Sequence, residues 1–366
     1  MTIMETNTYT SDLAIHPGEY LEEVLEEIRM SQADLSKRLG RPTQAINEII
    51  KGKKSITPTT AIELEDVLKV PAHIWIGLEA EYQMVIAKQK ELKVMEEETA
   101  LLPNFPYLEL AKLGFVKTTR NAIEKVDELR SFFSVAQLSR LEHVGAYQSA
   151  FRVTNHKNIS HESIASWIQA GRIKADTITT EPFDKSKLKK ALPELKATMN
   201  LEINRALKAC EELLASYGVA FVLLPHFKNT GAQGATFWID NREKAVLMMT
   251  LRGKNSDLFW FSFFHEIGHI LLHNKREMFL EGGYETPELQ QQEDEANTFS
   301  RDFLIPPKEW KTFTKTSIFT KASVRDFAKS LNIKTSIVVG RLMFEKYIGY
   351  GHPLRSEIDK YAFKEA

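Results

Sequence analysis

The stretch FFHEIGHILLH, residues 263 to 273, constrains this chain more than any other, because it places titratable side chains inside an apolar run. On an α-helix His265 and His269 are four residues apart, so both imidazoles project from one face. A buried pair of histidines without partners would be unfavourable, so a metal ion or hydrogen bonds must satisfy them. We therefore expect a mostly buried helix that carries a polar site on one face.

A third metal ligand could come from either of two glutamates, Glu293 and Glu295. Both lie in the downstream amphipathic segment QQEDEANTFSRDFLIP. Glu293 shares a face with Ala296 and Ser300, the side expected to be buried, whereas Glu295 points toward solvent. The pattern favours Glu293, with Asn297 as a residue that orients a ligand. Two histidines and one glutamate, with a fourth position for water, are the ligands of a catalytic zinc site. We expect one Zn²⁺ per chain.

Glu266 is the candidate catalytic residue. It lies about 100° around the helix from His265, where its carboxylate can reach a water molecule without being a ligand. The reaction would be hydrolysis of a peptide bond by a zinc endopeptidase, with the substrate extended along an exposed sheet edge at residues 235–239. Tyr284 or His352 could stabilise the oxyanion. Whether the chain is an enzyme stays open at this point.

The last histidine of the motif, His273, lies a full turn beyond the pair. It is four residues after His269, at the C-terminal end of the expected helix. We expect it to be a cation favoured by the helix dipole rather than a metal ligand.

The N-terminal block separates its charges, although the formal net charge of the 366-residue chain is −1. Between residues 31 and 54, six basic residues stand against two acidic ones. Start and stop signals predict helices that begin near Pro17, Ser31 and Pro42, the second of them ending at Gly40. Two short helices joined by a glycine turn are typical of a helix-turn-helix, whose second helix enters the major groove of DNA.

The candidate DNA contacts lie on these two helices and just after them. Gln44 and Asn47 can pair with adenine edges, and Arg41 can read guanine or bind a phosphate. The lysines that follow would hold the DNA backbone. The expected DNA-binding residues are Gln32, Arg41, Pro42, Thr43, Gln44, Asn47, Lys51, Lys53 and Lys54.

Apolar runs and turn signals predict a mainly α fold with a small antiparallel sheet (α+β). Strands are expected at 219–225, 235–239 and 245–251. The predicted parts are a helix-turn-helix domain at 11–78, a helical connector or spacer at 79–195, a zincin-like metallopeptidase domain at 196–310 and a C-terminal helical segment at 311–366. The last segment is expected to serve packing or dimerisation.

The composition of the chain indicates the cellular compartment of the protein. No segment approaches the roughly 18 unbroken apolar residues of a membrane span, and the N-terminus lacks the features of a signal peptide. The single cysteine, Cys210, excludes an internal disulfide and fits a reducing compartment. We expect a cytoplasmic protein without a membrane partner.

Two stretches resemble known families. The run SQADLSKRLGRPTQAINEIIKGKKSITPTTAIEL is similar to the Cro/cI-type (XRE) domain of HigA-family antitoxins, although Ser36 stands where such helices usually carry alanine. FFHEIGHILLH, followed by EDEANTFSRDFLIP, is similar to ImmA/IrrE-family metallo-endopeptidases, with Ser300 as a departure.

These resemblances imply a DNA-binding transcriptional regulator. It would be the antitoxin of a type II toxin-antitoxin module: a homodimeric autorepressor that binds its own operator DNA and neutralises a small ribonuclease toxin. The alternative is an active zinc endopeptidase that cleaves a regulator, or itself, in response to a signal.

Overall fold

The computed structural model describes residues 13–151, 159–231, 233–239, 243–250, 255–273, 279–280, 287–316 and 318–361. The chain divides into two compact units between Glu97 and Glu98. None of the helices in the described residues combines the length and the apolar character needed to span a membrane.

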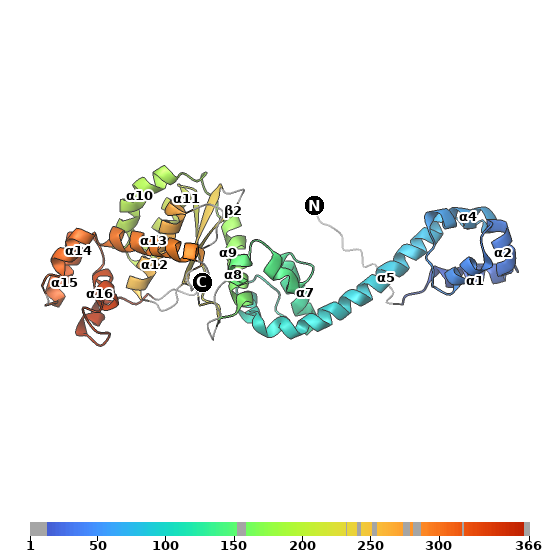
Figure 1. The fold of residues 1–366 in the computed structure, drawn as a ribbon, viewed down its shortest axis with the longest axis horizontal. Coiled ribbons are helices and arrows are strands. Elements are labelled where there is room, and N and C mark those ends of the chain that lie inside the picture. The colour runs from blue at the N-terminus through green and yellow to red at the C-terminus, as the bar shows by residue number, and fades with distance from the viewer. Residues whose placement is uncertain are drawn as a thin grey trace. The chain divides into compact units, whose positions relative to one another are not determined.

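Unit 1 is helical throughout its described part (Figure 1). Apolar side chains of its first four helices, together with Trp75 of the fifth, form one buried core. A Cβ at Gly18 would collide with the carbonyl oxygen of Ile49, so glycine lets the first helix approach the third this closely. The helices are α1 (Pro17–Glu27), α2 (Gln32–Leu39), α3 (Thr43–Ile50), α4 (Pro58–Leu68) and α5 (Ala72–Glu98).

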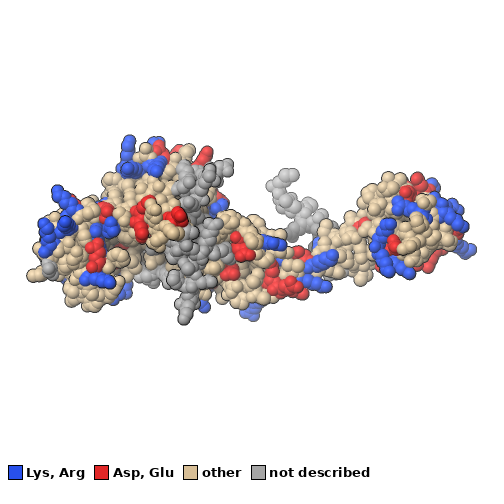
Figure 2. Space-filling view, viewed as in Figure 1, with Lys and Arg blue, Asp and Glu red and all other residues tan. Residues whose placement is uncertain are grey.

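The helix signals predicted for unit 1 are confirmed. Pro17 occupies the first turn of α1, and the Ser31 hydroxyl caps α2 by accepting the Asp34 N–H at 3.1 Å. Gly40 ends α2 in the left-handed region, with φ of 65°. Lys and Arg side chains occupy several parts of the visible face of this unit (Figure 2). The local sequence therefore defines the helix-turn-helix geometry directly.

Unit 2 begins with helices and 3₁₀ turns that precede a sheet. Apolar side chains of its last two helices before the sheet belong to the same buried core as the helices that follow the sheet. The elements are η1 (Thr99–Asn104), α6 (Tyr107–Lys112), α7 (Ala122–Phe133), η2 (Leu138–His143), α8 (Gln148–Phe151), α9 (His161–Thr177), α10 (Lys185–Thr198) and α11 (Ile203–Ala215).

The sheet has the strand order β1-β3-β2-β4. β2 pairs antiparallel with β3 and with β4, but β1 pairs parallel with β3. The sheet is therefore mixed rather than antiparallel throughout. After β1 the chain continues beyond the position of β3 to form β2, and β3 then returns between β1 and β2, parallel to β1. The mainly helical class with a small sheet is confirmed. The strands are β1 (Val219–Leu223), β2 (Gly234–Ile239), β3 (Lys244–Met249) and β4 (Phe279–Leu280).

Helices pack on both faces of the sheet (Figure 1). Leu247 and Met249 of β3 lie in one core with α12 (Ser256–Leu272). Met248 alternates to the other face, where its side chain lies against Gly171 of α9. Burial on both faces explains why the strands are apolar runs rather than alternating ones.

Two of the helices after the sheet, α13 and α16, pack directly on α12. Their apolar side chains, from Leu304 to Leu342, join the core that contains α12, so the C-terminal segment has the packing role predicted for it. Dimerisation through this segment stays a prediction. The elements are α13 (Pro287–Leu304), α14 (Pro307–Phe313), α15 (Lys321–Ser330), α16 (Thr335–Phe344) and η4 (Pro353–Glu357).

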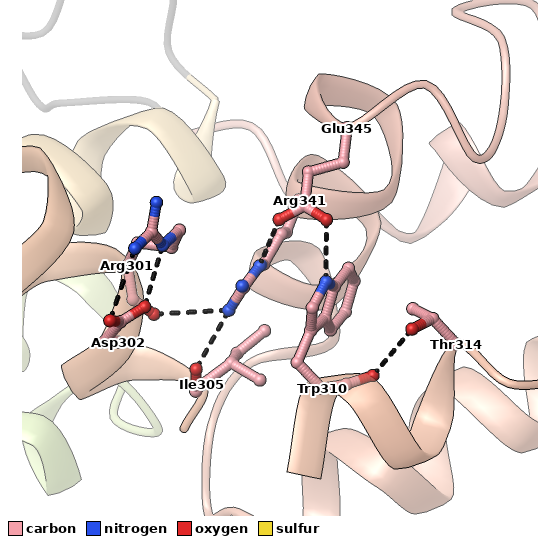
Figure 3. Close-up of polar contacts among 7 residues, drawn as sticks. All are labelled: Arg301, Asp302, Ile305, Trp310, Thr314, Arg341 and Glu345. Carbon is pink, nitrogen blue, oxygen red and sulfur yellow. Dashed lines mark hydrogen bonds and ion pairs between the residues drawn. The ribbon is translucent and has the colours of Figure 1, made fainter. Parts of the chain in front are cut away.

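Arg341 of α16 holds the C-terminal end of α13 (Figure 3). Its Nη1 donates to the carbonyl oxygen of Ile305 at 2.9 Å and to that of Arg301 at 3.4 Å. Its Nε donates to Glu345 at 2.8 Å, and its guanidinium lies 4.4 Å from the ring centre of Trp310. Because the last carbonyls of a helix carry partial negative charge, the cation stabilises this end of α13.

We expect Arg341→Met to lower the free energy of unfolding of unit 2 by about 3 kcal/mol, because the charged hydrogen bonds are lost and Glu345 keeps its charge. Arg325→Met is the matched control, since the ion pair of Arg325 with Glu357 leaves its side chain 60% exposed. Chemical denaturation followed by circular dichroism measures both. Equal losses in the two variants would contradict the role given to Arg341.

Candidate metal centre and DNA-binding surface

The residues predicted to contact DNA lie on α2, at the start of α3 and directly after α3. Pro42, Thr43 and Gln44 are exposed at the start of α3, and Asn47 lies half-buried one turn later. Asn47 Nδ2 donates to Gln32 Oε1 at 3.2 Å, which joins the two helices. The Gln44 side-chain amide donates to Glu48, on the next turn of α3, at 2.9 Å.

The turn between α2 and α3 is fixed by Ser36 and Arg41. The Ser36 hydroxyl donates to the Arg41 carbonyl and accepts from the Thr43 hydroxyl at 3.1 Å, so the unusual serine has a structural role. The Arg41 guanidinium forms an ion pair with Glu63 of α4, and its side chain is 24% exposed. A contact of Arg41 with guanine or phosphate stays a prediction, and it would compete with this ion pair.

The predicted phosphate contacts follow α3 directly. Lys51, Lys53 and Lys54 are all exposed. Gly52 between them has φ of 68°, a left-handed conformation that glycine adopts without strain. This turn places the three lysines beside the exposed end of the helix pair, where a DNA backbone would pass.

The second site lies between α12 and α13. His265 and His269 project from α12, and Glu293 projects from α13. A Cβ at Gly268 would lie 3.0 Å from the Phe299 ring and 3.3 Å from the Cα of Ala296. The glycine therefore lets α13 come close enough for Glu293 to meet the histidines.

The three predicted ligands come together in the structure. The Nε2 atoms of His265 and His269 are 2.9 Å apart, and the Glu293 carboxylate lies 3.0 Å from Nε2 of His269 and 3.4 Å from Nε2 of His265. All three side chains are buried. Within the described residues they form a group of ligating atoms that lie within 4.8 Å of one another, close enough to hold one metal ion.

The hydrogen bond of His265 tests whether this group fits a cation. Its Nδ1 lies 3.0 Å from Oδ1 of Asn297, the residue predicted to orient a ligand. An amide oxygen only accepts, so Nδ1 carries the proton and Nε2 presents a lone pair to His269 and Glu293. Lone pairs that converge on one point repel one another unless a cation lies between them. The donor set therefore fits a divalent metal such as Zn²⁺.

The protonation states of the ligands also suit a metal. Burial lowers the pKa of His269 to about 4, which leaves its imidazole neutral at pH 7. Burial alone would raise the pKa of Glu293, but its close contacts with the imidazoles of His265 and His269 outweigh burial and lower this pKa to about 2. Neutral imidazoles and an ionised carboxylate are the forms that bind metal ions.

Glu266 lies beside this group, packed against the start of β2. Its side chain is buried, and a Cβ at Gly234 would collide with its carboxylate. The prediction of residues 235–239 as an exposed edge is wrong at its start, because Ala235 and Thr236 pair with β4. No pattern in the sequence predicted β4, a strand of only two residues.

The remaining predicted residues lie elsewhere or beyond the described part. Glu295 is 47% exposed, as the sequence predicted. His273 is at the C-cap of α12, where its side chain is only 3% exposed, and it lies outside the group of ligating atoms, as the sequence predicted. Tyr284 lies outside the described residues, and His352 caps η4 by accepting the Leu354 N–H at 3.2 Å.

Comparisons with known proteins fit both sites. Residues 21–75 match the helix-turn-helix family, and residues 230–343 match the IrrE N-terminal-like domain, a peptidase family. Virulence-associated protein I of Dichelobacter nodosus is 34% identical over 82 residues, which are 22% of this chain and 76% of that protein. The chain belongs to the helix-turn-helix family. It also carries an IrrE N-terminal-like domain, within which His265, His269 and Glu293 all fall.

Solved structures similar to the helix-turn-helix part include two of the HigA family. An addiction module antidote protein of Coxiella burnetii is 36% identical, with a TM-score of 0.22, over 23% of this chain and 94% of that one. Antitoxin HigA of Pseudomonas aeruginosa, solved with the higBA promoter, is 32% identical, with a TM-score of 0.22, over 24% of this chain and 95% of that one.

Proposed function

We propose that the chain is a transcriptional regulator that reads operator DNA with α3 and holds one Zn²⁺ on His265, His269 and Glu293. The observation that carries the DNA-binding part is the helix-turn-helix domain, with polar side chains exposed at the start of α3 and lysines directly after it. The observation that supports the zinc part is the buried group of three ligating side chains between α12 and α13.

The DNA-binding surface separates residues that read bases from residues that bind the backbone. Gln44 and Asn47 carry amides that can pair with adenine in the major groove. Lys51, Lys53 and Lys54 carry charges that contribute affinity without sequence information. A homodimer would place two copies of α3 on two-fold symmetric half-sites.

For DNA binding, we expect Gln44→Ala to weaken binding to the selected operator by about 1–3 kcal/mol and to leave binding to random DNA nearly unchanged. Lys53→Ala should weaken both and make the salt dependence shallower by about one unit, because one phosphate contact is lost. The operator is first enriched from DNA upstream of the gene and from a random pool. Failure to enrich any sequence would contradict operator binding, and equal losses for Gln44→Ala on both DNAs would remove its reading role.

For the metal, we expect the purified protein to hold one zinc per chain and Glu293→Gln to lose it, because an amide is a much poorer ligand than a carboxylate. Asp294→Asn is the matched control, a neighbouring carboxyl group that is exposed on the same helix. Metal analysis after dialysis gives the stoichiometry. Zinc retained by Glu293→Gln would contradict the assignment of Glu293 as a ligand. Chelation should leave the circular dichroism largely unchanged, since the surrounding core is large.

The toxin-antitoxin role rests on the resemblance of residues 31 to 64 to HigA-family antitoxins. We propose a small ribonuclease toxin as the protein partner and repression of the chain's own promoter as the output. Co-expression with a small reading frame beside the gene tests this role. Growth arrest that this chain does not relieve would contradict it.

A second candidate function, peptide-bond hydrolysis, is favoured by the place of Glu266 beside the ligand group. Bound zinc would polarise the scissile carbonyl and make water more acidic. The Glu266 carboxylate would take a proton from the attacking water and deliver it to the leaving amine. Gly234 gives this carboxylate room on the β2 side.

For hydrolysis, we expect Glu266→Gln to keep its zinc and to cut a protein substrate about 10²–10⁴-fold more slowly than the wild type, because the proton acceptor is missing. Candidate substrates are the partner toxin, other repressors and the chain itself. Fragments are followed by mass spectrometry. Equal cleavage by the two proteins would point to a contaminating protease and remove the claim.

A further inference from the structure

Three histidines, rather than two, lie along one side of α12 and its C-cap. His265, His269 and His273 are spaced four residues apart, and the ring centres of successive pairs are 4.6 Å and 5.0 Å apart. The proposed zinc site uses the first two rings. The third ring is buried beside them without being part of the ligand group.

A chain of close polar contacts runs from His269 through His273 to α13. Nδ1 of His269 lies 2.9 Å from Nδ1 of His273, and Nε2 of His273 lies 3.2 Å from Oε2 of Glu295. The other carboxylate oxygen of Glu295 accepts from the side-chain amide of Gln291 at 2.8 Å. The glutamate is therefore held at this position from its own helix.

For neutral imidazoles, the chemistry of these atoms indicates which nitrogen carries each proton. A carboxylate only accepts, so Nε2 of His273 donates to Glu295. When both imidazoles are neutral, each has one N–H, so Nδ1 of His273 is an acceptor and the contact at 2.9 Å places a proton on Nδ1 of His269. Nε2 of His269 is then left with its lone pair facing His265 and Glu293.

We propose that His273 and Glu295 are positioning residues, which set the tautomer and the ring orientation of His269 so that Nε2 is presented to the metal. The proposal rests on the proposed zinc site. Glu295, which the sequence analysis considered as an alternative third ligand, acts through His273 and does not bind the metal itself. Asn297 does for His265 what this pair does for His269, so α13 orients both imidazoles while it supplies Glu293.

The affinity experiment uses the full-length protein and two variants of one residue. His273→Leu removes the acceptor for the Nδ1 proton of His269, whereas His273→Gln offers an amide oxygen in a side chain of similar reach. Competition with a chromophoric chelator measures the zinc affinity. We expect His273→Leu to bind zinc about 10–100-fold more weakly and His273→Gln to recover most of this loss.

A second measurement reads the tautomer directly. Proton–nitrogen correlation spectra of histidine-labelled protein, after zinc has been removed, should show the Nδ1–H form of His269 in the wild type and the Nε2–H form in His273→Leu. A general loss of packing would not move the tautomer in this way. Circular dichroism of both variants checks that the fold is kept.

The outcomes separate this proposal from the zinc site. Unchanged zinc affinity in His273→Leu, or the Nε2–H form in the metal-free wild type, would overturn the positioning role and leave the zinc site standing. Absence of zinc from the wild-type protein would overturn the zinc site, and the positioning role with it. Equal loss of affinity in His273→Leu and His273→Gln would show that the ring packs there without acting as an acceptor.

Discussion

The burial of α12 on nearly every side is the constraint on which unit 2 depends. Phe263, Phe264 and Ile267 are fully buried around the helix, so the polar residues between them cannot reach water. Burying a polar group without a hydrogen-bond or metal partner is unfavourable, so His265 and His269 need partners within the protein. The sheet covers one side of the helix with apolar side chains. The partners therefore come from α13.

The position of α13 thus decides whether the ligand group exists. Gly268 allows the close approach near the middle of α13, and Arg341 and Lys196 hold its C-terminal carbonyls. Arg341 comes from α16, which follows α12 and α13 in the sequence, and Lys196 comes from α10, which precedes them. A change far from the histidines along the chain can therefore move Glu293. The geometry of the ligand group therefore depends on the whole of unit 2 and not on the HExxH motif alone.

The sequence predicted the features that depend on residues close to one another along the chain. Ser31 and Gly40 gave the ends of α2, the spacing of His265 and His269 gave their shared face, and helical periodicity chose Glu293 over Glu295. It did not predict the parallel pairing of β1 with β3, because strand order depends on contacts between distant segments. The contact of His273 with His269 and Glu295 was missed for the same reason. Its one available signal was the third histidine at the same spacing.

In unit 1 the constraint on the polar side chains is the opposite one. The amides of Gln44 and Asn47 have to remain accessible to DNA and still be ordered before it binds. Each side-chain amide of Gln44 and Asn47 donates one of its two N–H groups inside the protein, to Glu48 and to Gln32 respectively. This leaves each amide with one donor and one acceptor, which is the pair that an adenine edge requires. The internal bonds therefore orient the amides without using the groups that would read a base in the proposed complex. Because less side-chain entropy is then lost on binding, more of the contact energy remains for discrimination between sequences.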